Sequence, residues 1–463
     1  MSDTLIEPED ESAELSQADV DADDVARIAQ AVDLSDPDLL TSILLERHPA
    51  DIADLFEQLA NEQLRAVVRL IPREITGDIL TELEDDSREL VLDELHPVEV
   101  ARAILDLETD DAIEVVEDME EEARAEVLAA VPARDRKILE QSLAFDEETA
   151  GRLMQREFVA APEFWTVGDA IDHMRAAGDD LPELFFEIYV VSPDFKPVGE
   201  VPVSHLMRSP RDTSLSDIML APRALIRPEM DQEEAAYLFE KYHLISAPVV
   251  DESGRLSGMI TVDDMVDVIQ EENKEDMLAL AGVTEAGLSD TVLSSVRARA
   301  PWLFVNLLTA VAASAVIALF EAAIAQLVAL AVLMPIVASM GGNAGTQSLA
   351  VAVRALASRD LTSANARRII VREMLTGVVN GLIFAVVMAI VAAVWFGRAD
   401  LGLVIAIAMV VNLASAGLSG IVIPLALKRF GADPAVASSV FVTTVTDMVG
   451  FFVFLGLAAW MLL

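Results

Sequence analysis

The 463-residue sequence contains no cysteine, and its basic residues are scarce. Without cysteine the chain can form neither a disulfide framework nor a thiolate metal site. Its beginning, MSDTLIEPEDESAELSQADVDADD, lacks the basic stretch and apolar core of a secretory signal peptide. The 32 Lys and Arg face 78 Asp and Glu, so the formal net charge is −46. Such an acidic chain repels nucleic acid and attracts cations, which predicts no nucleic-acid partner.

The acidic residues are concentrated in the first part of the chain. Residues 1–295 hold 72 of the 78 Asp and Glu and 22 of the 32 Lys and Arg, whereas residues 296–463 hold six acids and ten bases. An acidic soluble part therefore precedes an apolar and slightly basic part, as expected where two parts of a chain meet different surroundings. Solvation alone would explain the acidic surface, and cation binding is the alternative.

Five apolar stretches follow Pro301, and each has the length of about 20 residues or more that crosses a bilayer core. They cover residues 302–320, 327–353, 369–396, 401–427 and 435–462. Arg and Lys gather before the first stretch, between the second and third, and between the fourth and fifth. Because basic loops stay in the cytoplasm, we predict a cytoplasmic N-terminus and an external C-terminus.

The second apolar stretch contains residues that are expected to interrupt a helix. Pro335 and the pair Gly341 and Gly342 weaken the helical hydrogen-bond ladder, and Asn343 begins a short polar run. Carbonyls freed at membrane depth need protein or a water-filled cavity to receive them. Close packing of small residues would explain the glycines alone. Glycines together with Asn, Thr and Gln favour a pore-lining segment or an ion site.

The last apolar stretch carries a single acid, Asp447, within TTVTDMVG. An acid at the centre of a membrane helix costs roughly 2.5–3.5 kcal/mol on insertion scales. A buried base could pair with it, but every Lys and Arg of this part lies near a helix end or in a loop. By chemistry alone the ligand could be a proton, Na⁺, Ca²⁺ or Mg²⁺. The absence of His from this part argues against a transition metal, and one Asp among amides and hydroxyls suits a hydrated Mg²⁺.

The soluble part begins with residues 1–35, which are acidic, show little apolar periodicity and are predicted to be disordered. In residues 36–150 the pattern is helical, and HPADIADLFEQL and HPVEVARAILDL resemble each other. Short amphipathic helices that recur in this way predict a superhelical α-solenoid. His48 and His96 each precede a proline, which favours helix starts over metal ligands.

Two units with alternating strand and helix signals follow, at residues 151–212 and 213–272. Their β-α-β-β-α order resembles a CBS domain, and CBS domains come in tandem and often bind adenosine nucleotides. The second unit keeps Thr261 and Asp264 at the places that hold ribose and phosphate neighbours. The first has Pro202 and His205 there, which argues against ATP binding to the CBS pair.

Acids crowd the helical pattern that closes the second unit. They are Asp264, Asp267, Glu272, Glu275 and Asp276. Several share a face at helical spacing, where like charges repel. A solvated acidic helix would account for them. The alternative is a divalent-cation site shared across subunits, because a bound cation relieves the repulsion.

The order of these parts resembles the MgtE family of bacterial magnesium transporters or channels. The resemblance rests on EETAGRLM, RARAPWLFVNLL, MGGNAGTQS and FVTTVTDMVGFFVFLGLA. It implies a multi-domain membrane protein with an all-α N-terminal superhelical domain, tandem α/β CBS domains, a connecting helix at 273–300 and a five-helix transmembrane domain at 301–463. It further implies a non-enzymatic homodimer in the bacterial inner membrane, with Mg²⁺ as both cargo and regulator.

The same resemblance assigns the sites. At the pore, Asp447 recognises Mg²⁺, assisted by Asn343, Thr446 and Gly450. In the cytosol, regulatory Mg²⁺ binds among Asp231, Glu233, Asp264, Asp267, Glu272, Glu275 and Asp276. Filled sites compact the soluble domains and close the pore, and empty sites repel and open it.

Other functions remain as alternatives. A transporter of another divalent cation such as Co²⁺ would use the same acid. A CBS-regulated transporter of an osmolyte or anion should show Lys or Arg at mid-membrane depth, and these are absent. A membrane-anchored nucleotide sensor without transport would leave Asp447 without a purpose.

Overall fold

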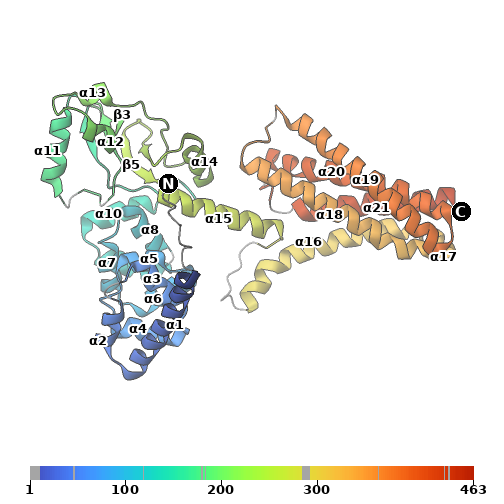
Figure 1. Cartoon of the computed structure of the whole chain (residues 1–463), viewed down its shortest axis with the longest axis horizontal. Helices are drawn as coiled ribbons and strands as arrows, with labels where there is room; N and C mark the ends of the chain where they lie inside the picture. Colours follow the sequence, from blue (N-terminus) through green and yellow to red (C-terminus); the bar gives the residue numbers. More distant parts are fainter. Residues whose placement is uncertain are drawn as a thin grey trace, which may run out of the picture. The chain divides into compact units, whose positions relative to one another are not determined.

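The computed structural model describes residues 11–44, 47–117, 119–178, 181–182, 184–283, 292–362, 364–431, 433–435 and 438–463. The chain divides into two compact units, Met1–Ile269 and Gln270–Leu463 (Figure 1). The first contains the acidic part and the second the apolar part, as the charge distribution along the sequence indicates.

Short helices make up the beginning of the first unit (Figure 1). They are α1 (Glu11–Leu34), α2 (Pro37–Leu44), α3 (Pro49–Glu57), α4 (Asn61–Leu70), α5 (Gly77–Glu82), α6 (Asp85–Glu94), α7 (Pro97–Ile104), α8 (Thr109–Glu117), α9 (Glu121–Ala130) and α10 (Ala133–Ser142). Their apolar faces share one buried cluster that includes Phe56, Leu80 and Val115. The all-α N-terminal domain is confirmed.

The two His-Pro pairs start helices, as the sequence predicts. His48 Nδ1 accepts a hydrogen bond from the backbone N–H of Ala50 at 3.3 Å, and His96 Nδ1 accepts one from Val98 at 3.4 Å. The proline that follows each histidine stands in the first turn, where its missing N–H leaves no bond unmade. Both imidazoles therefore cap helices.

The prediction of disorder up to residue 35 is wrong for the end of that segment. Helix α1 runs to Leu34, and Ile28 and Ala31 are fully buried in the core of the helical domain. Asp24, also buried, pairs with Arg27 at 2.7 Å and with Arg47. The acidic composition concealed a short apolar face with helical spacing. Residues 1–10 lie outside the described residues.

The first CBS unit has the predicted β-α-β-β-α order. Its elements are β1 (Ala160–Pro162), α11 (Val167–Ala177), β2 (Glu187–Val191), β3 (Pro197–Pro202) and α12 (Val203–Arg208). Strand β2 lies between β1, to which it is parallel, and β3, to which it is antiparallel. The continuous apolar run that follows Glu187 in EIYVV buries both faces of this central strand.

The second CBS unit repeats this order with a shorter sheet. It consists of α13 (Leu215–Ile218), α14 (Gln232–Tyr242), β4 (Ser246–Val250), β5 (Leu256–Thr261) and the start of α15 (Val262–Leu280). A single parallel bridge between Ile226 and Val249 stands where the opening strand is expected. A buried 2.8 Å hydrogen bond between Tyr189 Oη and Ser246 Oγ joins the first CBS unit to the second, which confirms the tandem CBS pair.

The connecting segment differs from the predicted helix at 273–300. Helix α15 continues without a break from the CBS unit to Leu280, and α16 (Val292–Ala318) begins before the predicted membrane boundary and passes through Pro301. Residues 284–291 of the predicted helix lie outside the described residues. The acidic helix α15 therefore extends into the predicted connecting segment from its N-terminal side, and the apolar helix α16 begins within that segment.

Within its described residues, the second unit contains five helices long and apolar enough to cross a membrane, as predicted. They are α16, α18 (Ala329–Ala357), α19 (Ala366–Phe396), α20 (Ala399–Arg429) and α21 (Ser438–Met461), with the short α17 (Glu321–Gln326) between the first two. Helix α20 is the most buried of them and packs against α18, α19 and α21.

Helix α18 is continuous, although the sequence predicts an interruption. It passes through Pro335 and all three glycines of the MGGNAGTQ motif. A Cβ added to Gly341 would collide with the side chain of Asn412, and one added to Gly345 would lie 2.5 Å from Val442 Cγ1. These glycines therefore let neighbouring helices approach, which is the small-residue packing that the sequence left open.

Candidate functional site

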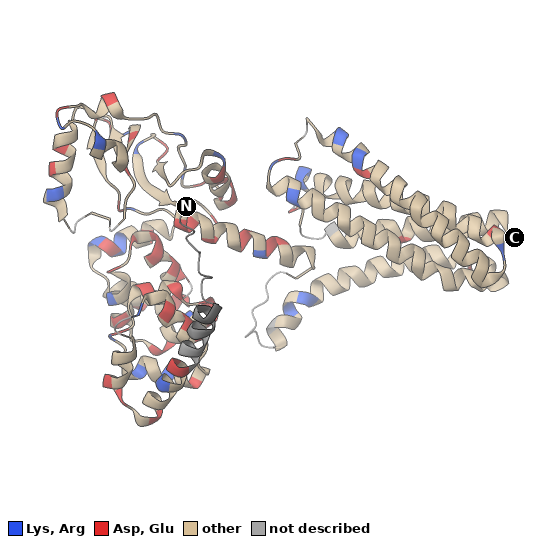
Figure 2. Ribbon diagram, viewed as in Figure 1, with Lys and Arg blue, Asp and Glu red and all other residues tan. Residues whose placement is uncertain are grey.

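In the described part of the chain, the acid of the last membrane helix lies in an apolar bundle without a partner. Asp447 lies in the middle of α21 and is half-buried, and among the described residues its carboxylate makes no hydrogen bond or ion pair. Lys and Arg of this unit lie toward the helix ends (Figure 2). A carboxylate removed from water without compensation is costly. Asp447 is therefore available to a ligand from outside the chain.

The other residues predicted for the pore fall into two groups. Thr446 is fully buried, and its hydroxyl donates to the carbonyl of Thr443 at 2.9 Å, so this hydroxyl is satisfied within α21. Gly450 is also buried. Asn343 is exposed on α18, and its Nδ2 donates to Ser339 Oγ at 3.4 Å. Of the four residues predicted for the pore, Asn343 and Asp447 have side chains with accessible polar groups.

The two membrane motifs lie against each other. A Cβ at Gly342 of α18 would lie 3.8 Å from Thr443 Cγ2 of α21. One turn further, a Cβ at Gly345 would meet Val442 and Thr446 at 2.5 and 3.5 Å. The structure therefore brings MGGNAGTQ and FVTTVTDMVG together, as a shared ion site requires.

Sequence reasoning missed Asn412, which lies in the middle of α20. Its side chain is fully buried, and Nδ2 donates to the carbonyl of Val337 in α18 at 2.8 Å. Its Oδ1 is buried and has no hydrogen-bond partner among the described residues. The signal in the sequence was a single amide in the apolar run LVIAIAMVVNLASAG.

Glu373 of α19 is a second polar residue that the sequence did not single out. It is buried, and its carboxylate accepts from Ser348 Oγ at 3.3 Å and pairs with Arg372 at 3.1 Å. A neighbouring base and a hydroxyl therefore compensate this acid, in contrast to Asp447. Its position beside the basic loop concealed it in the sequence.

In the first unit, acids of the helical domain lie close to acids of the second CBS unit. Glu108 and Asp111 flank the start of α8, and Asp263 and Asp264 open α15. Burial, together with the charges of nearby acids, raises the pKa of Glu108 to about 7 and that of Asp111 to about 6. Burial also raises the pKa of Asp264 to about 7. These shifts show a cluster of carboxylates that resist being charged together.

Asp110 is the most buried member of this acidic cluster, with 8% of its surface exposed. Burial raises its pKa well above the ordinary value, and the charge of Asp264 raises it further. Asp264 itself accepts hydrogen bonds from the hydroxyl and backbone N–H of Thr261, at 2.8 and 3.3 Å. The sequence had identified Asp264 but no acid of the helical domain. The signal was ETDDAIE, in which four acids stand at the start of a helical pattern.

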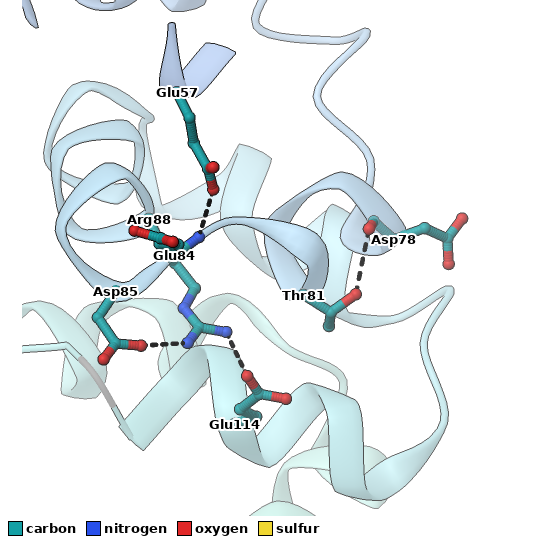
Figure 3. Close-up of polar contacts among 7 residues, drawn as sticks. All are labelled: Glu57, Asp78, Thr81, Glu84, Asp85, Arg88 and Glu114. Carbon is teal, nitrogen blue, oxygen red and sulfur yellow. Dashed lines mark hydrogen bonds and ion pairs between the residues drawn. The ribbon is translucent and has the colours of Figure 1, made fainter. Parts of the chain in front are cut away.

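A buried arginine holds α8 in place (Figure 3). Arg88 of α6 donates to Asp85 at 2.9 Å and to Glu114 of α8, and its side chain is 5% exposed. Glu57 accepts from the backbone N–H of Glu84 at 2.9 Å and fixes the start of α6 (Figure 3). These bonds position the helix that presents Asp110.

Both ends of α8 are also tied to the stretch that enters the first CBS unit. Glu157 accepts from the backbone N–H and hydroxyl of Thr109, at 3.1 and 2.8 Å. At the other end Glu117 pairs with Arg152. Because both contacts join the helical domain to the CBS entry, they fix α8 where its acids approach α15.

The remaining predicted ligands lie on α14 and α15. Asp231 caps α14, because its Oδ1 accepts from the backbone N–H of Glu233 at 2.9 Å and of Glu234 at 3.4 Å. Asp267 follows on α15, and burial raises its pKa. The others are further along the same helix, at Glu272, Glu275 and Asp276. Among the described residues, no three His, Asp or Glu are arranged to hold a metal ion.

Comparison with known proteins decides the family. A family model described as MgtE, a divalent cation transporter, matches residues 334–457, and a model of the MgtE intracellular N domain matches residues 47–148. The magnesium transporter MgtE of Bacillus subtilis (strain 168) is 31% identical over 418 residues, covering 90% of this chain and 92% of the relative. The chain belongs to the MgtE family. The predicted family and fold class are confirmed.

A second relative agrees with membership of the MgtE family. The magnesium transporter MgtE of Enterococcus faecalis (strain ATCC 700802 / V583) is 35% identical over 321 residues, or 69% of this chain and 71% of the relative. A crystal structure of the cytosolic domain of the Mg²⁺ channel MgtE in complex with ATP is 30% identical with a TM-score of 0.49, covering 53% of this chain and 99% of that one. A CBS model matches residues 215–271, which form the second CBS unit.

Proposed function

We propose that this chain carries Mg²⁺ across a bacterial inner membrane and that Asp447 recognises the ion. The observation that carries the proposal is the uncompensated carboxylate of Asp447 at the meeting of the two membrane motifs. Mg²⁺ keeps several of its waters and binds through one or two carboxylates, so a site with a single acid per chain suits it. Relatives named as magnesium transporters support the choice of cargo.

The ion path lies between two copies of the chain. The apolar membrane helix α18 carries exposed polar residues, which supports a second subunit that covers them. These residues are Asn343, Thr346 and Gln347. Polar groups facing lipid are unfavourable, and a dimer interface or pore removes them from lipid. Two copies of Asp447 near a two-fold axis repel when the pore is empty, and a hydrated divalent ion relieves that repulsion.

The membrane orientation follows from the basic loops. Arg354 lies in the last turn of α18, Arg359 lies between α18 and α19, and Arg367 lies in the first turn of α19. Lys428 and Arg429 end α20. Both loops lie on the same side of a five-span protein, together with the N-terminal domains. The positive-inside rule makes that side cytoplasmic and leaves the C-terminus outside.

Mg²⁺ also regulates the flux. Acids at the start of α8 and of α15 repel when they are charged, and the raised pKa values of Glu108, Asp111 and Asp264 support this repulsion. Mg²⁺ bound there, and at the other predicted acids on α14 and α15, favours the compact, closed arrangement. The shift depends on how much more tightly the closed arrangement binds Mg²⁺ than the open one does.

The proposal is tested by Mg²⁺ uptake into liposomes that contain the purified protein. Asp447→Ala and Asp447→Asn should each lower uptake by about a hundredfold or more, because the intramembrane carboxylate is lost. Asp400→Asn is the matched control, since that acid lies at the exposed start of α20 and pairs with Arg398. Uptake by Asp447→Ala at the wild-type rate, with the control also active, would remove Asp447 from the ion path.

A further inference from the structure

Asn412 is a buried amide whose partners lie on the two helices that carry the proposed ion site. Its Nδ2 donates to the Val337 carbonyl of α18 at 2.8 Å. Its Oδ1 is equally buried and has no donor among the described residues. Buried polar groups are normally paired, and an unpaired carbonyl is unfavourable in a low dielectric. An apolar side chain of similar size would avoid this cost. Stability alone therefore does not explain why an amide stands at this position.

Two glycines make room for this amide. A Cβ on Gly341 of α18 would collide with Asn412 Nδ2, and a Cβ on Gly450 of α21 would lie 2.8 Å from the same atom and 3.2 Å from Oδ1. The side chain of Asn412 therefore fills a space that α18 and α21 leave open together. The separation of these two helices from α20 is set at this point by one side chain.

The same level of the bundle holds the ion site. Gly341 precedes Asn343 by two residues, and Gly450 follows Asp447 by three. With a helical rise of about 1.5 Å per residue, each ion-site residue lies roughly 3–4.5 Å along its helix axis from the glycine that contacts Asn412. A change at Asn412 is therefore transmitted to Asn343 and Asp447 through one turn of rigid helix.

We propose that Asn412 is a positioning residue for the ion site. Its amide holds α18 and α21 at a fixed distance from α20 and thereby sets the distance between Asn343 and Asp447, without contact with the ion. This inference rests on the proposed function, because those two residues must form the site. A fixed separation matters for a hydrated divalent ion, since small displacements of ligands change affinity and selectivity strongly.

Four variants test whether Asn412 positions the ion site. They are Asn412→Ala, Gly341→Ala, the double variant that combines them, and the control Gly456→Ala. The control is a glycine of α21 whose added Cβ would lie 3.7 Å from Phe320, in ordinary contact. Each variant is examined for Mg²⁺ uptake as a function of Mg²⁺ concentration, for the ratio of Mg²⁺ to Co²⁺ uptake, and for its thermal midpoint in detergent.

Asn412→Ala should raise the KM for Mg²⁺ by about tenfold or more and lower the ratio of Mg²⁺ to Co²⁺ uptake, because the ligand distance is no longer fixed. Gly341→Ala alone should impair uptake, because its methyl group collides with the amide. In the double variant the methyl group of the new alanine at position 341 occupies the space that the Asn412 side chain has left. Adding Gly341→Ala to Asn412→Ala should therefore lower uptake little further. Gly456→Ala should behave as the wild type. If Asn412→Ala yields no folded protein, Asn412→Ser replaces it with the same expectations.

A purely structural role predicts a different result. In that case Asn412→Ala lowers the thermal midpoint but leaves KM and the uptake ratio at wild-type values, and this result would overturn the inference. Additive effects of the two substitutions would also overturn it. Wild-type uptake by Asp447→Ala would instead refute the proposed function, while non-additive thermal midpoints for Gly341 and Asn412 would still establish the contact. The two failures are therefore distinguishable.

Discussion

The two units of this chain use acids in opposite ways. In the second unit one carboxylate, Asp447, has no partner among the described residues of an apolar bundle. In the first unit several carboxylates lie close together, and burial, followed by the charge of Asp264, raises the pKa of Asp110. The first kind of site is unfavourable because water is removed, and in the second, like charges meet in addition to the loss of water. A divalent cation relieves the unpaired charge of the first and the mutual repulsion of the second.

This difference bears on what each site can do in the proposed function. A single acid per chain offers few ligands, so the ion keeps its waters and leaves easily, as a conduit requires. A cluster of acids offers a change in repulsion between two helices, so a bound ion changes the arrangement of domains, as a sensor requires. If the acidic cluster is a sensor, neutralising its acids should abolish the response to Mg²⁺, and loss of the Arg88 contacts that hold α8 should weaken that response.

The largest effect is expected from neutralising the cluster. Asp110→Asn together with Asp264→Asn removes the strongest repulsion between α8 and α15 and should mimic the ion-filled, closed state. Uptake into liposomes should then be low and should no longer depend on internal Mg²⁺. In the wild type we expect internal Mg²⁺ to change the uptake rate more than tenfold, which corresponds to about 1.4 kcal/mol. Glu140→Gln, an exposed acid of α10, is the control. An unchanged dependence on Mg²⁺ in the double variant would contradict the sensor.

The acidic cluster should also respond to pH when Mg²⁺ is absent. Because burial raises the pKa of Glu108 and of Asp264 to about 7, the docked arrangement binds more protons than the undocked chain. Its stability therefore falls as pH rises through this range, and a shift from about pH 8 to about pH 6 should stabilise it. Limited proteolysis of the full chain should show slower cleavage between the helical domain and the CBS pair at the lower pH.

The double variant Asp110→Asn with Asp264→Asn supplies the control for this pH effect. It should show a weaker dependence of cleavage on pH, because two of the titrating acids are gone. Faster cleavage of the wild type at about pH 6 than at about pH 8 would have the wrong sign for raised pKa values and would count against repulsion in the cluster.

The fold could be predicted from the sequence more fully than the sites. Apolar length predicted the five membrane helices, and the His-Pro pairs predicted the starts of α3 and α7, because each depends on local residues. Helix α1 was missed because its apolar face, around Ile28, is short and surrounded by acids. The continuity of α18 was missed because a glycine that breaks an isolated helix also admits a neighbour, here Asn412.

For the sites, the sequence predicted single residues but not their partners. Asp447 stood out because its apolar context is local in the sequence. Asp110 did not, because its burial depends on a contact between α8 and α15 across about 150 residues, which no short-range pattern records. The same reason applies to Asn412, whose partners come from two other helices, α18 and α21.

A smaller effect is expected from the arginine that supports α8. Arg88→Met keeps the apolar length of the side chain but removes the bonds to Asp85 and Glu114, at a cost of about 2 kcal/mol. Hydrogen exchange in α8 should accelerate, and a higher Mg²⁺ concentration should be needed for closure. Arg211→Met removes an exposed pair with Asp172 and should change stability by less than about 1 kcal/mol. Equal effects of the two variants would show that the burial of Arg88 is unimportant.

The smallest effect is expected from ATP. The first CBS unit ends β3 with Pro202 where a hydroxyl is expected, and in the second the Thr261 hydroxyl already donates to Asp264 at 2.8 Å. ATP at about 1 mM without Mg²⁺ should therefore leave the thermal midpoint of the full chain unchanged, since a ligand stabilises only what it binds. A shift that Thr261→Ala abolishes would contradict this and would add a nucleotide to the ligands of the acidic unit. Asp264 would then serve both ligands, and ATP and Mg²⁺ titrated together should compete at this residue.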